Sequence, residues 1–417
     1  MPSPLRSRLG AIPVLLALIL SLPACDSGNG GGEEVETDQI VNGVNFTRLF
    51  AEPTDAEVQA VRADWAGRNT TSSPATIRGT ATVDGASVTV VEHTVTATGG
   101  GTVTHYGVIR VPSGASGERP ILIVHHGGDN GFSIDAADRT GPPTSNTGVR
   151  QFATAFPALA ASTVQVFPVY RSETISTTGF PTLGGPYTAG GDESPWDYDV
   201  DDSIALLSAV QGLDLFASSI DEDRVGAIGF SRGANTAALQ AIRDDRIDAL
   251  VDYYGPTDFV NPGAVTLATL LLSPTPSPAV FGLPGAQFLF DNVLNPLRNA
   301  DGSVNPNADY AGARLAVVRR SASAFTESLP DTQVHHHYQD AVVPVAFSQA
   351  FEAAGAEPSG GSFEVFYYGT EGGATSGVFH APELSPDMQA SIPRVQAFFS
   401  GRFSGAAARQ PALALAY

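Results

Sequence analysis

Residues 223–233 read Asp-Arg-Val-Gly-Ala-Ile-Gly-Phe-Ser-Arg-Gly, and this stretch decides how the rest of the chain is interpreted. A short apolar strand runs into Gly-Phe-Ser-Arg-Gly, and a helix is expected to begin directly after it. A turn this sharp leaves no room for a side chain at Gly229 or Gly233, and it holds Ser231 in a strained conformation with its hydroxyl exposed. Strand, Gly-x-Ser-x-Gly and helix in this order are typical of a serine presented as a nucleophile.

The composition indicates one large folded domain. The chain has 417 residues, of which 42% are hydrophobic and 16% are charged, so it can bury a sizeable core. Strands and helices alternate from about residue 120 onward, which predicts an α/β domain with a mostly parallel sheet flanked by helices. The formal net charge of −21 repels nucleic acid and anionic lipid headgroups. We therefore exclude nucleic-acid binding as a main role.

The N-terminus has the pattern of an export signal. Residues 1–24 combine a basic start at Arg6 and Arg8 with a short apolar run, and the only cysteine, Cys25, follows. This pattern resembles a bacterial lipoprotein signal, which implies that Cys25 is lipidated and holds the protein in the cell envelope through the lipid alone. The alternative is an ordinary signal peptide with an incidental cysteine. Residues 25–39 are Gly-rich and acidic and are expected to form a flexible tether.

The sequence of the first part of the domain predicts antiparallel strands that extend the sheet. Residues 57–67 have the apolar spacing of a short helix, and Asp84-Gly85 suits a hairpin turn. Alternating strands are expected at residues 76–83, 87–96 and 102–111. Further strands are expected at residues 120–124, 163–169, 249–254, 332–336 and 362–368, and helices at 152–161, 194–212, 345–354 and 385–399.

The alternation of strands and helices is interrupted once. Residues 259–330, inside the expected domain at 40–404, form an insertion that is expected to be a helical lid or binding element. Its apolar pieces at 267–272 and 281–290 could line an acyl pocket or touch a membrane, and ordinary lid packing is the interpretation we favour. Residues 405–417 are expected to be a loose tail.

An acidic stretch precedes the central motif. Residues 194–202 predict the start of a long helix, with Ser194 as its cap, Pro195 in its first turn and acidic residues at its positive end. The alternative is that the carboxylates bind a cation or a substrate amine.

A serine nucleophile needs a base to take its proton and a carboxylate to orient that base. For Ser231, the expected base is His380, in a Gly-rich loop after the last predicted strand. The expected acid is Asp340, directly after the penultimate strand. Asp258, after an earlier strand, is the competing acid, although its Gly-Pro-Thr-Asp setting also suits a turn.

The transition state also needs donors for the developing oxyanion. One donor is expected to be the backbone amide of Arg232, and the other the amide of Gly127, with His126 or Gly128 as neighbours. Each such donor typically contributes about 3 kcal/mol of transition-state stabilisation. The side chain of Arg232 could contact a substrate carboxylate or pair with a nearby acid, and the sequence favours neither.

Three consecutive histidines, His335, His336 and His337, invite a metal interpretation. Consecutive residues of a strand point to opposite faces, so the three cannot easily converge on one ion. We expect neither a metal site nor an organic cofactor.

From about residue 120 to residue 399 the chain resembles an α/β-hydrolase, and it is most similar to the catalytic domains of the prolyl oligopeptidase and dienelactone hydrolase group. The resemblance implies that Ser231, Asp340 and His380 form a catalytic triad. It rests on the motifs at residues 124–128, 168–172, 196–202, 223–233, 254–258 and 340–344.

The chain departs from both groups. Several oligopeptidases supply an oxyanion donor from a tyrosine where this chain has His126, and they carry a β-propeller that the segment before residue 120 is too short to form. Dienelactone hydrolases use a cysteine nucleophile, whereas this motif holds Ser231. We therefore expect a carboxylic ester hydrolase that acts on a small-molecule ester through an acyl enzyme. A serine peptidase and a catalytically silent binding module are the alternatives, and the sequence predicts no oligomeric state.

Overall fold

The computed structural model describes residues 38–114, 117–128, 130–134, 148–213, 220–276, 278–355, 361–381 and 385–404. The expected signal peptide, Cys25, most of the tether and the C-terminal tail lie outside these residues. Within the described ranges, no helix has both the length and the apolar character to cross a membrane.

A nine-stranded sheet forms the centre of the fold, in the order β14-β13-β12-β11-β6-β8-β5-β4-β3. Its strands from β14 to β8 run parallel to their neighbours, and β5, β4 and β3 extend the sheet in antiparallel fashion. The expected mixed sheet is therefore present. The strands are β3 (Thr76–Val83), β4 (Ala86–Thr96), β5 (Thr102–Val111), β6 (Arg119–His125), β8 (Val164–Pro168), β11 (Ile220–Phe230), β12 (Ile247–Tyr253), β13 (Asp331–His337) and β14 (Phe363–Tyr368).

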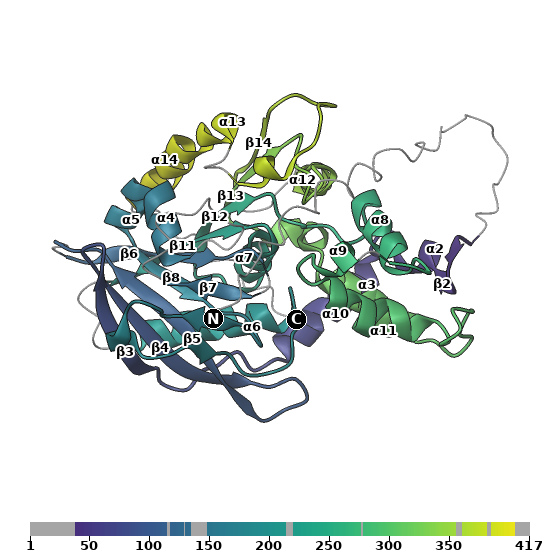
Figure 1. The fold of residues 1–417 in the computed structure, drawn as a ribbon, viewed down its shortest axis with the longest axis horizontal. Helices are drawn as coiled ribbons and strands as arrows, with labels where there is room; N and C mark the ends of the chain where they lie inside the picture. Colours follow the sequence, from purple (N-terminus) through teal and green to yellow (C-terminus); the bar gives the residue numbers. More distant parts are fainter. Residues whose placement is uncertain are drawn as a thin grey trace, which may run out of the picture.

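The two faces of the sheet carry separate apolar layers, as the alternation along β6 shows. Ile121 and Ile123 point into one layer and Leu122 and Val124 into the other, and all four are buried. Helices α6 (Tyr198–Gln211) and α7 (Arg232–Arg243) cover the first face. Helices α4 (Val149–Ala155), α5 (Pro157–Ser162) and α14 (Ser391–Ser404) cover the second (Figure 1).

The insertion at residues 259–330 is mainly helical and forms a lobe beside the C-terminal ends of the strands (Figure 1). Its helices are α8 (Pro262–Leu271), α9 (Pro278–Phe281), α10 (Ala286–Leu289) and α11 (Tyr310–Arg319), with shorter turns η5 (Phe290–Leu294), η6 (Asn295–Leu297) and η7 (Ala322–Ser328). Smaller elements are β1 (Ile40–Val41), β2 (Val44–Asn45), α2 (Phe46–Leu49), β7 (Gly131–Ser133), β9 (Thr174–Ser176), η3 (Pro181–Leu183), β10 (Tyr187–Thr188), α12 (Ala346–Gly355), η8 (Gly377–His380) and α13 (Pro386–Gln389).

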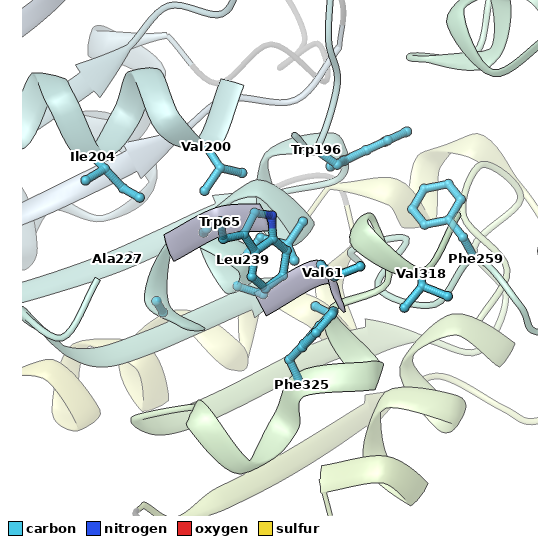
Figure 2. Packing of buried hydrophobic residues seen from close by; sticks show 14 of the residues in the cluster. Val61, Trp65, Trp196, Val200, Ile204, Ala227, Leu239, Phe259, Val318 and Phe325 are labelled. Carbon is cyan, nitrogen blue, oxygen red and sulfur yellow. The ribbon is translucent and has the colours of Figure 1, made fainter. Parts of the chain in front are cut away.

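Helix α3 (Asp55–Ala66) attaches the N-terminal segment to both the lobe and the central domain. Trp65 of this helix belongs to the same buried cluster as Leu239 of α7 and Phe325 of the insertion (Figure 2), and the centroids of the Trp65 and Phe325 rings lie 4.6 Å apart. The guanidinium of Arg243 lies 5.0 Å from the Trp65 ring. The sequence predicts this helix but not its partners, because its apolar stripe can pack on any complementary surface.

Three expected helices differ from the structure, one in where it begins and two because each is divided into two helices. The helix expected from residue 194 begins at Tyr198, because Trp196 before it has a positive φ of 56° that a regular helix does not accommodate. The helix expected at 152–161 breaks at Phe156, before Pro157, since a residue preceding proline avoids the helical conformation. The last expected helix is divided into α13 and α14.

We predict that Trp65→Ala lowers the free energy of unfolding by about 3–5 kcal/mol, because the cavity lies where three parts of the chain meet. Urea denaturation measures the change. Gln59→Ala on the exposed face of the same helix is the control and is expected to have little effect. Equal stabilities for the Trp65 variant and the control would show that α3 does not hold the lobe in place.

Candidate active site

The turn that carries Ser231 is closed by backbone contacts. Strand β11 ends at Phe230 and α7 begins at Arg232, so Ser231 alone makes the turn, with φ 55° and ψ −124°. Its amide donates to the carbonyl of Tyr253 at 2.9 Å. A Cβ at Gly229 would lie 2.3 Å from the carbonyl oxygen of Gly233, which is why this position requires glycine. The strain at Ser231 is therefore held by neighbouring backbone.

A second close approach joins this turn to the end of β6. A Cβ at Gly233 would lie 2.4 Å from the carbonyl oxygen of His126 and 2.5 Å from that of His125. The start of α7 consequently lies directly against the His-His-Gly-Gly loop. As the first residue of the helix, Arg232 has a backbone amide with no intrahelical acceptor. The structure thus brings together the two loops from which the oxyanion donors are expected.

Asp340 and His380 also meet. Nδ1 of His380 lies 2.7 Å from Oδ2 of Asp340, and both residues are buried. The other carboxylate oxygen of Asp340 accepts the amides of Val342 at 2.7 Å and Val343 at 3.1 Å. The carboxylate is therefore fixed by the backbone of its own loop while it orients the imidazole.

The remaining nitrogen of the imidazole is available. Within the described residues, Nε2 of His380 has no hydrogen-bond partner although it is buried. Tyr254 packs against the imidazole with ring centroids 4.3 Å apart, and it directly follows Tyr253, whose carbonyl holds the Ser231 amide. The same piece of chain therefore supports both the serine turn and the histidine ring.

Asp258 lies in a different environment. Its Oδ1 accepts the backbone amides of Val260 at 2.8 Å and Asn261 at 3.1 Å. These bonds close the turn before α8, which matches the turn interpretation of this aspartate rather than the role of competing acid.

The side chain of Arg232 does not face the solvent. It is 1% exposed, and it donates to Glu173 at 2.5 Å and to Asp199 at 2.7 Å, with the Tyr170 ring 4.8 Å away. Burial by itself would lower the pKa of Arg232, but the two carboxylates raise it overall. Burial raises the pKa of Asp199 to about 6, against the opposing effect of Arg232. Of the two open roles for Arg232, pairing with nearby acids is the one observed.

Glu173 extends this contact to the loop after β6. It accepts the amide of Gly131 at 3.0 Å, and its Oε2 lies 3.3 Å from Nε2 of His126. Burial lowers the pKa of His126 to about 3, so this ring is neutral. Arg232 also donates to the carbonyl of Gly128 at 3.3 Å. We call Arg232, Glu173 and Asp199 the Arg232 clamp, because they tie the serine turn to the loop of residues 126–131.

The sequence interpretation missed Glu173. The available signal was its position after β8, a strand that neighbours β6, so that its loop meets the loop after β6. A single glutamate in a loop gives no indication of burial.

The sequence interpretation also missed a second buried acid, which lies beside the serine turn. Asp252 of β12 pairs in register with Gly229 of β11. Burial raises the pKa of Asp252 to about 7, and the amide of Gly255, which donates to it at 2.9 Å, has the opposite effect.

The acidic residues at the start of α6 are paired with arginines from distant elements. Arg171 contacts Asp202 through two bonds of 2.7 and 2.8 Å, and Arg68 contacts Asp197 at 2.5 Å and Asp201 at 3.1 Å. These ion pairs account for the carboxylates at the helix start without a bound cation or amine.

The three consecutive histidines have separate partners. His335 contacts the hydroxyl of Tyr368 at 2.9 Å, and His336 contacts Ser348 at 2.7 Å. Nδ1 of His337 accepts the backbone amide of Gln339 at 3.1 Å. Across the residues that the structure describes, no group of three or more histidine, cysteine, aspartate or glutamate side chains could hold a metal ion.

An apolar pocket opens at Ser231. It contains about 1260 Å³ of empty space, its mouth included, and its walls come from the insertion and from the loop after Asp340. Ser231 itself is only 4% exposed, so its hydroxyl faces this pocket rather than the outer surface that the turn alone would predict. Trp196 lines the pocket and packs on Phe259, with ring centroids 4.7 Å apart.

No family model and no curated protein matches the chain. Among solved structures, acetyl xylan esterase 1 from Thermoanaerobacterium sp. is similar, with a TM-score of 0.52 and 15% identity over 85% of this chain and 96% of that chain. The fold is that of an α/β-hydrolase.

Two further structures with this α/β-hydrolase fold are more distant. An acetyl xylan esterase from Paenibacillus sp. has a TM-score of 0.45 and 14% identity over 84% of this chain and 95% of that chain. A putative dipeptidyl aminopeptidase IV from Bacteroides ovatus has a TM-score of 0.45 and 10% identity, over 78% of this chain but only 36% of that chain.

We predict that Arg232→Met lowers the free energy of unfolding by about 3–5 kcal/mol, because Glu173 and Asp199 would lose the buried cation that both of them contact. Urea denaturation at neutral pH measures this. Arg402→Met removes a more exposed arginine from its pair with Asp331 and is expected to change stability by about 1 kcal/mol or less. Similar losses in the two variants would mean that the Arg232 clamp is no more important than a surface pair.

Proposed function

We propose that this α/β-hydrolase is a serine hydrolase that cleaves carboxylic esters with Ser231, His380 and Asp340. The contact of 2.7 Å between His380 and Asp340 carries the proposal, together with the neighbouring residues Tyr253 and Tyr254, which contact the strained turn of Ser231 and the His380 ring respectively. A serine at a strand-to-helix turn, a buried acid and a histidine with one unengaged nitrogen are the parts that this chemistry needs.

The reaction follows from the roles of these groups. Nε2 of His380 takes the proton of the Ser231 hydroxyl while its oxygen attacks the ester carbonyl, and Asp340 keeps the imidazole oriented and stabilises its charge. The amides of Arg232 and Gly127 stabilise the oxyanion, with His126 and Gly128 shaping their loop. His380 then gives the proton to the leaving alcohol. Water, activated by the same histidine, releases the acid from the acyl enzyme.

A peptidase activity is the alternative within the same fold. Nothing in the described walls of the pocket offers an unpaired charge for a peptide terminus, because Arg232, their one charged residue, is paired in its clamp. This favours the ester substrate. A panel of p-nitrophenyl esters and peptide anilides separates the two activities.

We predict that a fluorophosphonate probe labels the protein once, on Ser231, and that Ser231→Ala abolishes both the label and the hydrolysis of p-nitrophenyl esters. The physical reason is that only a hydroxyl activated by a neighbouring base attacks the probe's phosphorus rapidly. Intact-mass and peptide spectrometry locate the adduct. A folded protein that takes up no label and hydrolyses no ester would instead support a catalytically silent binding module.

Two aspartates provide a matched comparison for that experiment. Asp340→Asn is expected to lower kcat by on the order of 10³–10⁴-fold, because an amide no longer holds the histidine in the correct tautomer. Asp258→Asn keeps an oxygen that can accept the same turn amides, so its kcat should stay close to that of the parent. The reverse pattern would assign the acid role to Asp258.

We also propose that the protein is exported and anchored in a bacterial cell envelope through a lipid on Cys25, because residues 1–25 match the pattern of a lipoprotein signal. The prediction is that bacteria expressing the full chain incorporate radiolabelled palmitate into the protein, and that Cys25→Ser does not. In fractionation, the parent should sediment with membranes and the variant should be soluble. Equal labelling of both would refute the anchor.

A further inference from the structure

The apolar pocket beside Ser231 has a wall built almost entirely of hydrocarbon. Helix α8 contributes Leu267, Ala268 and Leu271, and the segment after it contributes Val280 and Leu289. Ser231 and Arg232 are its polar members. A substrate group that enters this pocket therefore meets apolar surface on every described side.

The polar members of the wall offer few free hydrogen-bonding groups to a charged or strongly polar substrate group. The two terminal nitrogens of the Arg232 guanidinium donate to Glu173 and Asp199, and the backbone carbonyl of Arg232 accepts the indole N–H of Trp196 at 3.0 Å. Within the described residues, only Nε of this guanidinium has no hydrogen-bond partner. A carboxylate, an ammonium group or a sugar hydroxyl placed against the apolar wall would lose its hydration without a compensating bond. The wall therefore favours apolar groups over polar ones.

The position of His380 tells which half of the ester the pocket holds. The leaving alcohol must lie against the histidine that protonates it. Among the described residues, Ser231 and Arg232 line the pocket and His380 does not. The alcohol therefore lies on the side of His380, and the acyl group, which stays bonded to Ser231, extends into the pocket.

We infer that the pocket is an acyl-binding site for medium-length apolar acyl groups, an inference that rests on the serine hydrolase function proposed above. The insertion and the N-terminal segment build this site together, since Phe50 lines it along with the helices of residues 259–330. An acetyl group would leave most of the apolar lining of the pocket uncovered, so acetyl esters are expected to be poor substrates. Each added methylene is removed from water on binding, which raises kcat/KM about fourfold, corresponding to about 0.8 kcal/mol.

The test measures kcat/KM for p-nitrophenyl acetate, butyrate, hexanoate and octanoate. The expected result is a rise of at least 100-fold from acetate to octanoate. A flat series, or one that falls with chain length, while activity still depends on Ser231, would overturn the acyl site and leave the proposed function standing. If no ester is hydrolysed and no fluorophosphonate label is taken up, the proposed function itself fails.

Variants in α8 connect the chain-length preference to the pocket. Ala268 is 4% exposed and lines the pocket, so Ala268→Leu places extra carbon atoms in it and is expected to lower the ratio of octanoate to acetate activity at least tenfold. The next residue, Thr269, is exposed and outside the pocket, so Thr269→Leu should leave the ratio unchanged. An unchanged ratio in folded Ala268→Leu would overturn the inference.

Two further measurements keep the test decisive. Thermal denaturation shows whether Ala268→Leu is folded, and if it is not, Leu267→Ala, at a partly exposed position of the same wall, should lower the octanoate preference by removing contact area. A series of alkyl acetates varies the alcohol instead of the acid. A chain-length preference confined to that series would assign the pocket to the alcohol and contradict the acyl assignment.

Discussion

The rest of the structure depends on the close approach of backbone at the serine turn. Gly229 packs against the backbone at the start of α7, and Gly233 packs against the carbonyl groups at the end of β6. At both positions a Cβ atom would lie too close to the neighbouring backbone. This packing holds Ser231 at a φ of 55° and sets α7 against the loop after β6. Because the parallel strands end on one edge, the loops after β12, β13 and β14 reach the same place. A strained turn thereby becomes the centre of a preorganised site.

Buried ion pairs hold the serine turn in one position relative to the loop after β6. Arg232 follows the serine, and its guanidinium, which is removed from water, must be neutralised by partners. Glu173 and Asp199 supply the charge, and they come from the loop after β8 and from the first turn of α6. Through Glu173 the clamp also holds Gly131, at the far end of the loop that contains Gly127. The side chain of Arg232 thus fixes the loop opposite the serine turn, and its backbone amide is the one we propose as an oxyanion donor.

The substrate side of the site is formed by parts that the central sheet does not contain. Apolar helices of the insertion cover the edge of the sheet that carries Ser231. Helix α3 secures the insertion through Trp65, which contacts Phe325 of the insertion and Arg243 of α7 (Figure 2). Arg314 of α11 reinforces this attachment with a bond of 2.9 Å to Glu57. The sheet therefore positions the serine turn, whereas the lobe forms most of the apolar wall of the pocket at Ser231. This division agrees with the general use of rigid scaffolds and variable insertions in α/β proteins.

The sequence by itself determined the strands, the serine turn and the order of Ser231, Asp340 and His380, because these depend on local patterns: alternation, apolar runs, glycines at a tight turn and loops after strands. The roles of these three residues remain predictions. The tertiary structure alone decided that Arg232 is paired with Glu173, that the acidic stretch is neutralised by arginines, and that Phe50 and the insertion enclose an apolar pocket at Ser231. These outcomes join residues far apart in the chain, and burial and charge pairing depend on which surfaces meet, which no local pattern specifies.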